Sequence, residues 1–239
     1  MTQPKTRRSR NGARVPAEDG APSYFGENIE RDLHEVSLRT GGGTMQSRIL
    51  VAAIALFAER GYENCNMRTL AGSVGLKAPT LYNYYPSKEA VLMEAIKFGM
   101  EDFFTYILKD IEQVPRATRL FEIIHRHATY KLHHRLIARA NDRLIDPQFA
   151  RMFLPEDVAR QFIQKMVEYR HLVQDLVRDY LSDDGPISPK VATLAILSQC
   201  DRMAYWYDPN GEMKPEQALE QMILLSRRML GLEVVASTE

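Results

Sequence analysis

Hydroxyl, amide and ammonium groups lie close together in the stretch LKAPTLYNYYPSKEAV, which runs from Leu76 to Val91. Three tyrosines and an asparagine follow a threonine, and a serine and a lysine come directly after a proline. Proteins use such groups to hydrogen-bond the phosphate oxygens and the base edges of nucleic acids. What the stretch can do depends on the elements that hold it, and the residues on both sides indicate them.

Two short helices joined by a glycine turn are predicted around this stretch. Asn66 can cap a first helix that holds Leu70 and Val74, and Gly75 breaks that helix. A second helix begins near Lys77. In a helix-turn-helix motif the second helix enters the DNA major groove by its N-terminal end. The order helix, glycine turn, helix therefore predicts a DNA-reading motif in which this second helix is the recognition helix.

The recognition helix carries residues of the size and polarity that a groove requires. Pro79 falls in the first turn, where its missing N–H costs nothing, and Leu81 should face inward and hold this helix on the preceding one. The residues expected at the groove are small or polar: Ala78, Pro79, Thr80 and Asn83.

The three tyrosines are expected to have different environments. Tyr82 and Tyr84, on the outer side of the helix, can reach phosphate oxygens with their hydroxyls, whereas Tyr85 can turn inward against the next helix. A second interpretation is that all three are core aromatics. Ser87 can cap the next helix and place Lys88 beside its N-terminal amides, where a phosphate could bind; the alternative is that Lys88 is only a solvated surface residue.

The composition is that of a globular protein with balanced charge. The chain has 239 residues, 45% of them hydrophobic, with 31 basic and 31 acidic residues, so binding of nucleic acid must be local. Two cysteines, Cys65 and Cys200, are far apart, which favours a reducing compartment over a disulfide-stabilised secreted domain. The longest apolar run, 49–58, is too short to span a membrane, and the N-terminus lacks the apolar segment of a signal peptide. We expect a cytoplasmic protein with no membrane contact.

Residues 1–43 are expected to form a disordered, partly basic N-terminal arm. They are rich in Pro, Gly, Ser and charged residues, and they end in the flexible sequence TGGG. A short helix over NIERDLHEVSLR is conceivable within the arm. The basic segment KTRRSR can either keep the protein in solution or contact phosphates.

From Thr44 onward, helical periods predict an all-α fold, because no alternating run bounded by turn residues indicates a strand. The first helix ends at Gly61, and its apolar face contains Ile49, Ala52, Ala53, Leu56 and Phe57. Prolines divide the rest of the chain into further helices. Pro189 and Pro215 are typical of a first helical turn.

The segment ILVAAIALFAERGYENCNMRTLAGSVGLKAPTLYNYYPSKEAVLMEAI, residues 49–96, resembles the N-terminal DNA-binding domain of the TetR family of transcriptional regulators. The resemblance implies an all-α regulator that binds a double-stranded DNA operator as a homodimer and has an effector pocket in a larger C-terminal domain. It implies a three-helix helix-turn-helix domain at 44–100, an effector-binding and dimerisation domain at 101–232 and a C-terminal tail at 233–239. We expect no catalytic residue and no cofactor.

The positions of the family motif also imply which residues contact DNA. They are Met67, Arg68, Thr69, Lys77, Ala78, Pro79, Thr80, Tyr82, Asn83, Tyr84 and Lys88. Lys77 stands where the family often has serine or threonine, so the recognition helix lacks a side-chain cap worth about 1 kcal/mol, and DNA could take its place. Asn66 in place of threonine and Tyr85 in place of phenylalanine are minor departures.

The C-terminal part gives weaker signals for a ligand site. AYWYDPNGEMKPEQALEQMILLSRRMLGL, residues 204–232, resembles the end of TetR regulators that respond to acyl-CoA thioesters or other lipid-derived compounds. A hydrophobic effector is expected between helices near 120–136 and 162–181, although a dry core would have the same apolar faces. The candidate ligand-binding residues are Phe121, Ile124, His125, Ala128, Met166, Tyr169, Arg170 and His171. Of these, Arg170 and His171 either meet a polar head group or face solvent.

Other functions have little support in the sequence. His127 and His134 lie seven positions apart, whereas two metal ligands on one helix need a spacing of three or four, so we expect no metal site. The sequence contains no G-x-S-x-G, H-E-x-x-H or G-x-G-x-x-G motif. We therefore do not expect an enzyme. The alternative is a small-molecule-binding or enzymatic helical protein in which the helix-turn-helix is incidental.

Two expectations concern the assembly. The helices near 189–207 and 215–230 keep apolar stripes and are predicted to form a dimer interface, which a charge at Met222 or Ile223 should disrupt. The helix from Ser87 to about Met100 connects the reading motif to the effector domain. We expect it to transmit ligand binding, so that a repressor leaves its palindromic operator when the effector favours another spacing of the recognition helices.

Overall fold

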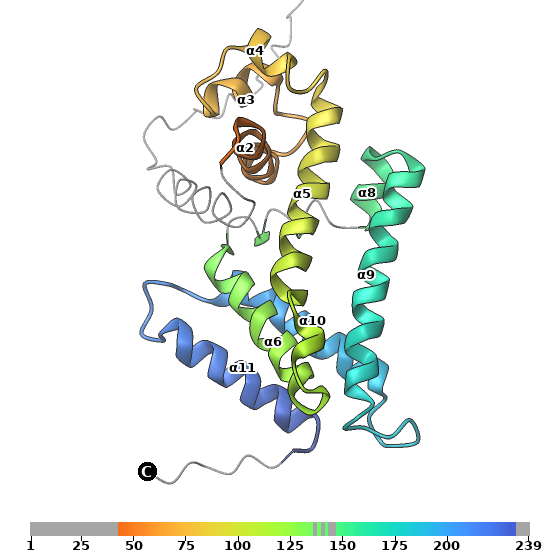
Figure 1. The fold of residues 1–239 in the computed structure, drawn as a ribbon. Coiled ribbons are helices and arrows are strands. Elements are labelled where there is room, and N and C mark those ends of the chain that lie inside the picture. The colour runs from red at the N-terminus through yellow and green to blue at the C-terminus, as the bar shows by residue number, and fades with distance from the viewer. Residues whose placement is uncertain (1–42, 136–137, 140–141, 143–146, 233–239) are drawn as a thin grey trace, which may run out of the picture.

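The computed structural model describes residues 43–135, 138–139, 142 and 147–232, and the chain in those ranges is helical without any strand (Figure 1). The all-α prediction is confirmed. Nearly all of the predicted N-terminal arm and the whole C-terminal tail lie outside the described residues. The elements are α2 (Met45–Arg60), α3 (Met67–Ser73), α4 (Ala78–Tyr82), α5 (Lys88–Leu108), the 3-10 helix η1 (Ile111–Gln113), α6 (Arg116–His133), α8 (Pro147–Phe153), α9 (Glu156–Val177), α10 (Pro189–Trp206) and α11 (Pro215–Met229).

Side-chain caps fix the starts of the N-terminal helices. Thr44 Oγ1 accepts from the Ser47 backbone amide at the start of α2. Asn66 Oδ1 accepts from the Thr69 amide at 2.9 Å at the start of α3. The predicted Asn66 cap is confirmed, and so are the starts of α10 at Pro189 and of α11 at Pro215.

Two glycines make the turns between the first helices possible. Gly61, with φ of 80°, ends α2, and Gly75, with φ of 74°, lies between α3 and α4. Backbone of this kind is costly for residues with a Cβ atom, so glycine is the residue that fits. The helix, glycine turn, helix order predicted from the sequence is present.

The N-terminal core forms where α2 packs on α5 and α3. Its most buried side chains include Ile49, Ala53, Ile54, Leu70, Leu81, Val91, Leu92 and Ala95. Three residues from much later in the chain, Leu154, Ala159 and Phe162, belong to the same cluster. The start of α9 and the residues just before it therefore complete the core under the helix-turn-helix.

The C-terminal core forms around α6, which packs on α5, α9, α10 and α11 (Figure 1). Its fully buried residues include Leu120, Ile123, Ile124, Val173, Leu176 and Ile196. The long helix α5 contributes to both cores: Met100 lies in the first cluster and Phe103 in the second. One continuous helix thus runs from the recognition motif into the C-terminal bundle.

We expect Ser87→Ala to lower the free energy of unfolding by about 1 kcal/mol, because Ser87 Oγ accepts from the Ala90 amide at 3.2 Å and satisfies the start of α5. Urea unfolding would measure this. Ser188→Ala is the matched control, since Ser188 precedes α10 without a side-chain capping bond. Equal losses in the two variants would show that the Ser87 bond does not stabilise the fold.

Candidate functional site

One face of the recognition helix α4 packs against the N-terminal core, and the opposite face is exposed. Leu81 is 0% exposed and packs in the N-terminal core, whereas Tyr82 is 50% exposed and Tyr84 is 38% exposed. Tyr85, just beyond the helix, is 8% exposed and also belongs to that core. The inward position of Leu81 and Tyr85 is confirmed. The hydroxyls of Tyr82 and Tyr84 stand on the surface where the sequence places DNA.

The polar residues around α4 are accessible. Pro79, Thr80 and Asn83 are exposed, and Ala78 is partly exposed. Lys77 caps α4 without a side-chain hydrogen bond, as its residue type predicted. The start of this helix therefore lies open to a ligand such as DNA.

At the start of α3, two of the three residues predicted to contact DNA are accessible and the third is buried. Arg68 is exposed, and Thr69 is partly exposed with its Oγ1 hydroxyl 3.2 Å from Asn66 Oδ1. Met67, in contrast, is 7% exposed and belongs to the N-terminal core. The Met67 side chain is used for packing, so the DNA contact predicted at Met67 stays a prediction that only its backbone could fulfil in this arrangement.

Lys88 makes two contacts within the protein. Its Nζ donates to the backbone oxygen of Tyr62 at 3.0 Å and lies 4.1 Å from the centre of the Tyr62 ring. The Tyr62 hydroxyl donates to Glu89 Oε1 at 3.2 Å. Burial, with the neighbouring Glu89, raises the pKa of Tyr62 to about 12, so the hydroxyl stays protonated. Lys88 thus joins α5 to the residues after α2, and the phosphate contact predicted for it stays a prediction.

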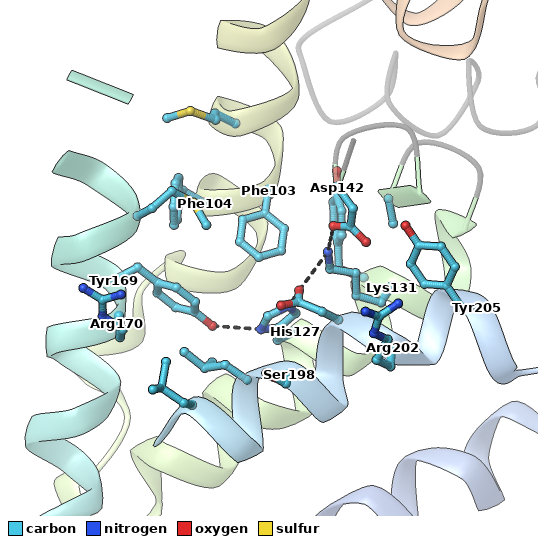
Figure 2. Close-up of a pocket in the computed structure, with 17 residues that line it drawn as sticks. Phe103, Phe104, His127, Lys131, Asp142, Tyr169, Arg170, Ser198, Arg202 and Tyr205 are labelled. Atoms are coloured by element: carbon cyan, nitrogen blue, oxygen red, sulfur yellow. Dashed lines mark hydrogen bonds and ion pairs between the residues drawn. The ribbon is translucent and has the colours of Figure 1, made fainter. Parts of the chain in front are cut away.

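The second site is a cavity of about 520 Å³ in the C-terminal bundle, lined by residues of α5, α6, α9 and α10 (Figure 2). Its apolar wall includes Met100, Phe103, Phe104, Met166, Leu194 and Leu197. Its polar lining includes His127, Lys131, Asp142, Tyr169, Arg170, Ser198, Asp201 and Arg202. A cavity with an apolar wall and a few convergent polar groups is the usual form of a small-molecule site.

The sequence identified the α9 side of this cavity and missed the α6 side. Met166, Tyr169 and Arg170 line it as predicted. Five predicted ligand residues do not line it, four of them because α6 faces the cavity with His127, Tyr130 and Lys131 instead. The five are Phe121, Ile124 and Ala128, which are buried in the C-terminal core; His125, which lines a separate groove with α11; and His171, which is exposed.

A chain of hydrogen bonds crosses the cavity from α9 to α10. The Tyr169 hydroxyl lies 3.1 Å from His127 Nδ1, and His127 Nε2 lies 3.0 Å from Asp201 Oδ1 (Figure 2). An ionised carboxylate can only accept, so His127 donates from Nε2 to Asp201; with a neutral imidazole, Tyr169 then donates to Nδ1. Burial raises the pKa of Tyr169 well above its usual value. Tyr169 therefore remains a neutral donor.

Lys131 brings a buried positive charge to the cavity wall. Its side chain is 5% exposed, and its Nζ donates to Asp201 Oδ1 at 2.9 Å and to Asp142 Oδ1 at 2.5 Å. Burial disfavours the ammonium, but the two carboxylates outweigh burial and raise the pKa of Lys131 above its ordinary value. Lys131 therefore stays charged, and its ammonium lies 5.4 Å from the centre of the Phe103 ring.

The pKa values of the two carboxylates, Asp201 and Asp142, shift in opposite directions. Burial opposes ionisation of Asp201, but the His127 hydrogen bond and the Lys131 charge hold its pKa well below the usual range. For Asp142, burial prevails over the attraction of Lys131, and the nearby Asp201 also acts against ionisation, so the pKa of Asp142 is raised. Asp201 is the better stabilised anion of the pair.

Arginines and an aromatic ring border the same cavity. Arg170 lies on α9, and Arg202 and Tyr205 lie on α10 (Figure 2). The Arg202 guanidinium is 5.5 Å from the centre of the Tyr205 ring, and that of Arg139 is 5.0 Å from it. The lining contains more positive than negative side chains, which suits an anionic ligand.

Among the described residues, no group of three His, Cys, Asp or Glu side chains is arranged to hold a metal ion. None of the described helices is long and apolar enough to cross a membrane.

Comparison with known proteins gives matches along most of the chain. Residues 49–95 match the family model described as bacterial regulatory proteins of the tetR family, and residues 113–230 match that of the tetracyclin repressor-like C-terminal domain. The HTH-type transcriptional repressor KstR2 of Mycolicibacterium smegmatis is 23% identical over 75% of this chain and 87% of its own length.

Solved structures agree with the fold. The ketosteroid transcriptional regulator KstR2 of Mycobacterium tuberculosis superposes with a TM-score of 0.65 at 19% identity, covering 79% of this chain and 94% of that one. AibR in complex with isovaleryl coenzyme A and operator DNA gives a TM-score of 0.64 at 19% identity, covering 75% and 96%.

The two family models account for both parts of the structure, the exposed recognition helix and the bundle that holds the cavity. Together they span well over half of the chain. The chain belongs to the TetR family and is a ligand-responsive, DNA-binding transcriptional regulator.

Proposed function

We propose that this regulator is a cytoplasmic repressor that binds a palindromic operator as a homodimer and leaves it when a largely apolar acyl compound fills the cavity. The observation that carries the proposal is that two helices, α5 and α9, extend from the core under the recognition helix to the cavity wall. Met100 of α5 and Met166 of α9 line the cavity, and both pack in or against the N-terminal core. A ligand that moves either helix moves the support of the recognition helix.

The chemistry of the wall supports an acyl effector. An alkyl or ring system fits against Phe103, Phe104 and Leu197, and polar donors at Lys131 and Arg170 suit a carboxylate or a thioester oxygen. AibR was solved with isovaleryl coenzyme A, and KstR2 is described as a ketosteroid regulator. Those ligands belong to those proteins, and they agree with a mainly apolar effector here.

Two helices can transmit the effect. The sequence predicted α5 as the connection, and α5 begins at Lys88 directly after the recognition motif and reaches the cavity at Phe103. The sequence did not predict the second connection, through α8 and α9. There the Phe153 ring packs edge-on to Tyr62 with centres 5.2 Å apart, and Tyr62 binds Lys88 through its backbone oxygen. A repressor of this kind works by population shift between two helix spacings.

A homodimer would supply the second recognition helix. Reading two half-sites of a palindrome requires recognition helices about 34–36 Å apart. Apolar side chains remain exposed on α10 and α11: Val191 is 60% exposed, Trp206 52% and Leu225 50%. Trp206 and Leu225 line one groove along α11, which suits contact with a second copy.

We expect Leu225→Glu to give monomers with a folded protomer and weak operator binding, because the charge falls on an exposed apolar surface. Light scattering and circular dichroism would measure both. Met222, which the sequence suggested for this test, is only 5% exposed, so a charge there should unfold the protomer and Met222→Glu serves as the contrast. If the wild type is a monomer at micromolar concentration, the dimer proposal is wrong.

The effector proposal is tested by selecting DNA fragments with the purified protein and then adding candidate effectors. Fatty acids, acyl-CoA thioesters and aromatic acids should release the fragments and raise the melting temperature by mass action. Release by sugars or metal ions alone would contradict an acyl effector. A protein that selects no DNA sequence would favour the alternative in which the helix-turn-helix is incidental.

A further inference from the structure

The ammonium of Lys131 holds two carboxylates that come from different parts of the chain. Asp201 belongs to α10, and Asp142 belongs to the segment between α6 and α8. Both line the cavity, and both bind the same Nζ atom. A buried ammonium needs compensating charge, but one carboxylate would suffice for that, so the second is open to exchange.

Asp201 is the carboxylate that we expect to keep its contact with Lys131 during such an exchange. It accepts from Lys131 at 2.9 Å and from His127 at 3.0 Å, and His127 is in turn held by Tyr169. Removing Asp201 would break this chain of bonds across the cavity. Asp142 interacts with Lys131 but lies close enough to Asp201 for the two charges to repel each other.

We propose that the carboxylate of Asp142 occupies the place at Lys131 that the carboxylate of the effector takes, with the effector's apolar chain against Phe103, Phe104 and Met166. This rests on the proposed acyl effector and names its head group. The exchange keeps Lys131 paired at every stage, because one anion leaves as another arrives. The side chains of Asp142 and Asp201 are 22% and 47% exposed, so solvent reaches both, and the hydrogen bond from His127 is what distinguishes Asp201 from Asp142.

The charges of the cavity favour an anion over the other head groups. Lys131, Arg170 and Arg202 are positive, whereas Asp142 and Asp201 are the acidic residues in the lining. A cationic ligand would be repelled by these three positive side chains, and it could not replace Asp142 as the partner of Lys131. A neutral alcohol could accept a hydrogen bond from Lys131 but could not replace the charge of Asp142.

The test compares three ligands that share one chain and differ in head group. Isothermal titration at neutral pH measures octanoate, octanol and octylamine binding to the wild type and to Asp142→Asn. Removing the competing anion should tighten octanoate about tenfold, equivalent to ~1.4 kcal/mol, and should leave octanol within about twofold. The wild type itself should prefer octanoate to octylamine.

Asp183→Asn is the matched control, because Asp183 pairs with Arg178 and its side chain is 71% exposed. It makes the same chemical change away from the cavity lining and should leave all three affinities unchanged. If circular dichroism shows that Asp142→Asn is unfolded, Asp142→Ser replaces it with the same expectation.

The outcomes separate the two proposals. Octanoate binding that is unchanged or weakened by the loss of Asp142 overturns the exchange and leaves the acyl effector standing. A wild type that binds octylamine more tightly than octanoate overturns the anionic head group. A folded protein that binds none of the three ligands overturns both proposals.

Discussion

Replacing Leu81 by alanine is expected to lower the free energy of unfolding by about 2–5 kcal/mol and to abolish operator binding. Leu81 is 0% exposed and is the one buried residue of the short recognition helix α4. A helix of this length is not stable alone, so its position depends on this contact. Urea unfolding measures the stability, and fluorescence anisotropy with a selected DNA fragment measures the binding.

The neighbouring residue provides the contrast. Tyr82 is 50% exposed, so Tyr82→Ala should change the stability by less than about 0.5 kcal/mol and still weaken DNA binding through the lost phosphate contact. If Tyr82→Ala binds the operator as the wild type does, the exposed face of α4 is not the DNA-reading surface. If Leu81→Ala retains both stability and binding, the account of how α4 is held is wrong.

The second large effect is expected from Lys131→Met. The substitution leaves Asp142 and Asp201 facing each other without their shared cation. Their side chains are 22% and 47% exposed, so solvent offsets part of the loss, and we expect a cost above that of a surface pair but below that of a fully buried one, which is about 3–5 kcal/mol. Without Lys131, burial and the neighbouring Asp201 raise the pKa of Asp142 in the folded state further above its unfolded-state value, whereas the His127 hydrogen bond still lowers the pKa of Asp201. The variant should therefore lose stability as the pH rises from about 4 to 7, and urea unfolding across that range measures the trend.

Lys97→Met is the matched control. Lys97 binds Glu94 at 2.8 Å on the surface of α5, with its side chain 45% exposed. Exposed pairs of this kind contribute about 0–1 kcal/mol. A Lys131→Met variant whose stability falls by no more than that of Lys97→Met would show that the Lys131 cluster does not hold the cavity together.

The recognition motif could be predicted closely because its signals are local. Asn66, Gly75, Pro79 and Ser87 act on their own helix ends, so residue type and spacing decide the outcome. The burial of Met67 could not be predicted in this way, because its position in the family motif says nothing about packing; its apolar side chain was the one local indication.

The cavity could be predicted only in part because its residues are joined by tertiary contacts. His127 lies 42 positions from Tyr169 and 74 from Asp201, and no local pattern reports such pairings. One signal was present: His127 and Lys131 are polar residues four positions apart on a helix with large apolar neighbours. One face of α6 packs in the core and an adjacent face lines the cavity. The apolar stripe that contains Phe121 and Ile124 marks the core face, so it did not indicate the residues that line the cavity.

The central claim is that filling the cavity and binding the operator oppose each other, and linkage makes this directly measurable. Calorimetry would give the affinity of octanoate for the free protein and for the protein saturated with its selected operator fragment. Coupling between two sites is reciprocal, so octanoate should bind the DNA-bound protein more weakly, by the same factor by which it weakens operator binding, typically about 5–150-fold. Equal octanoate affinity in the two states would contradict the account.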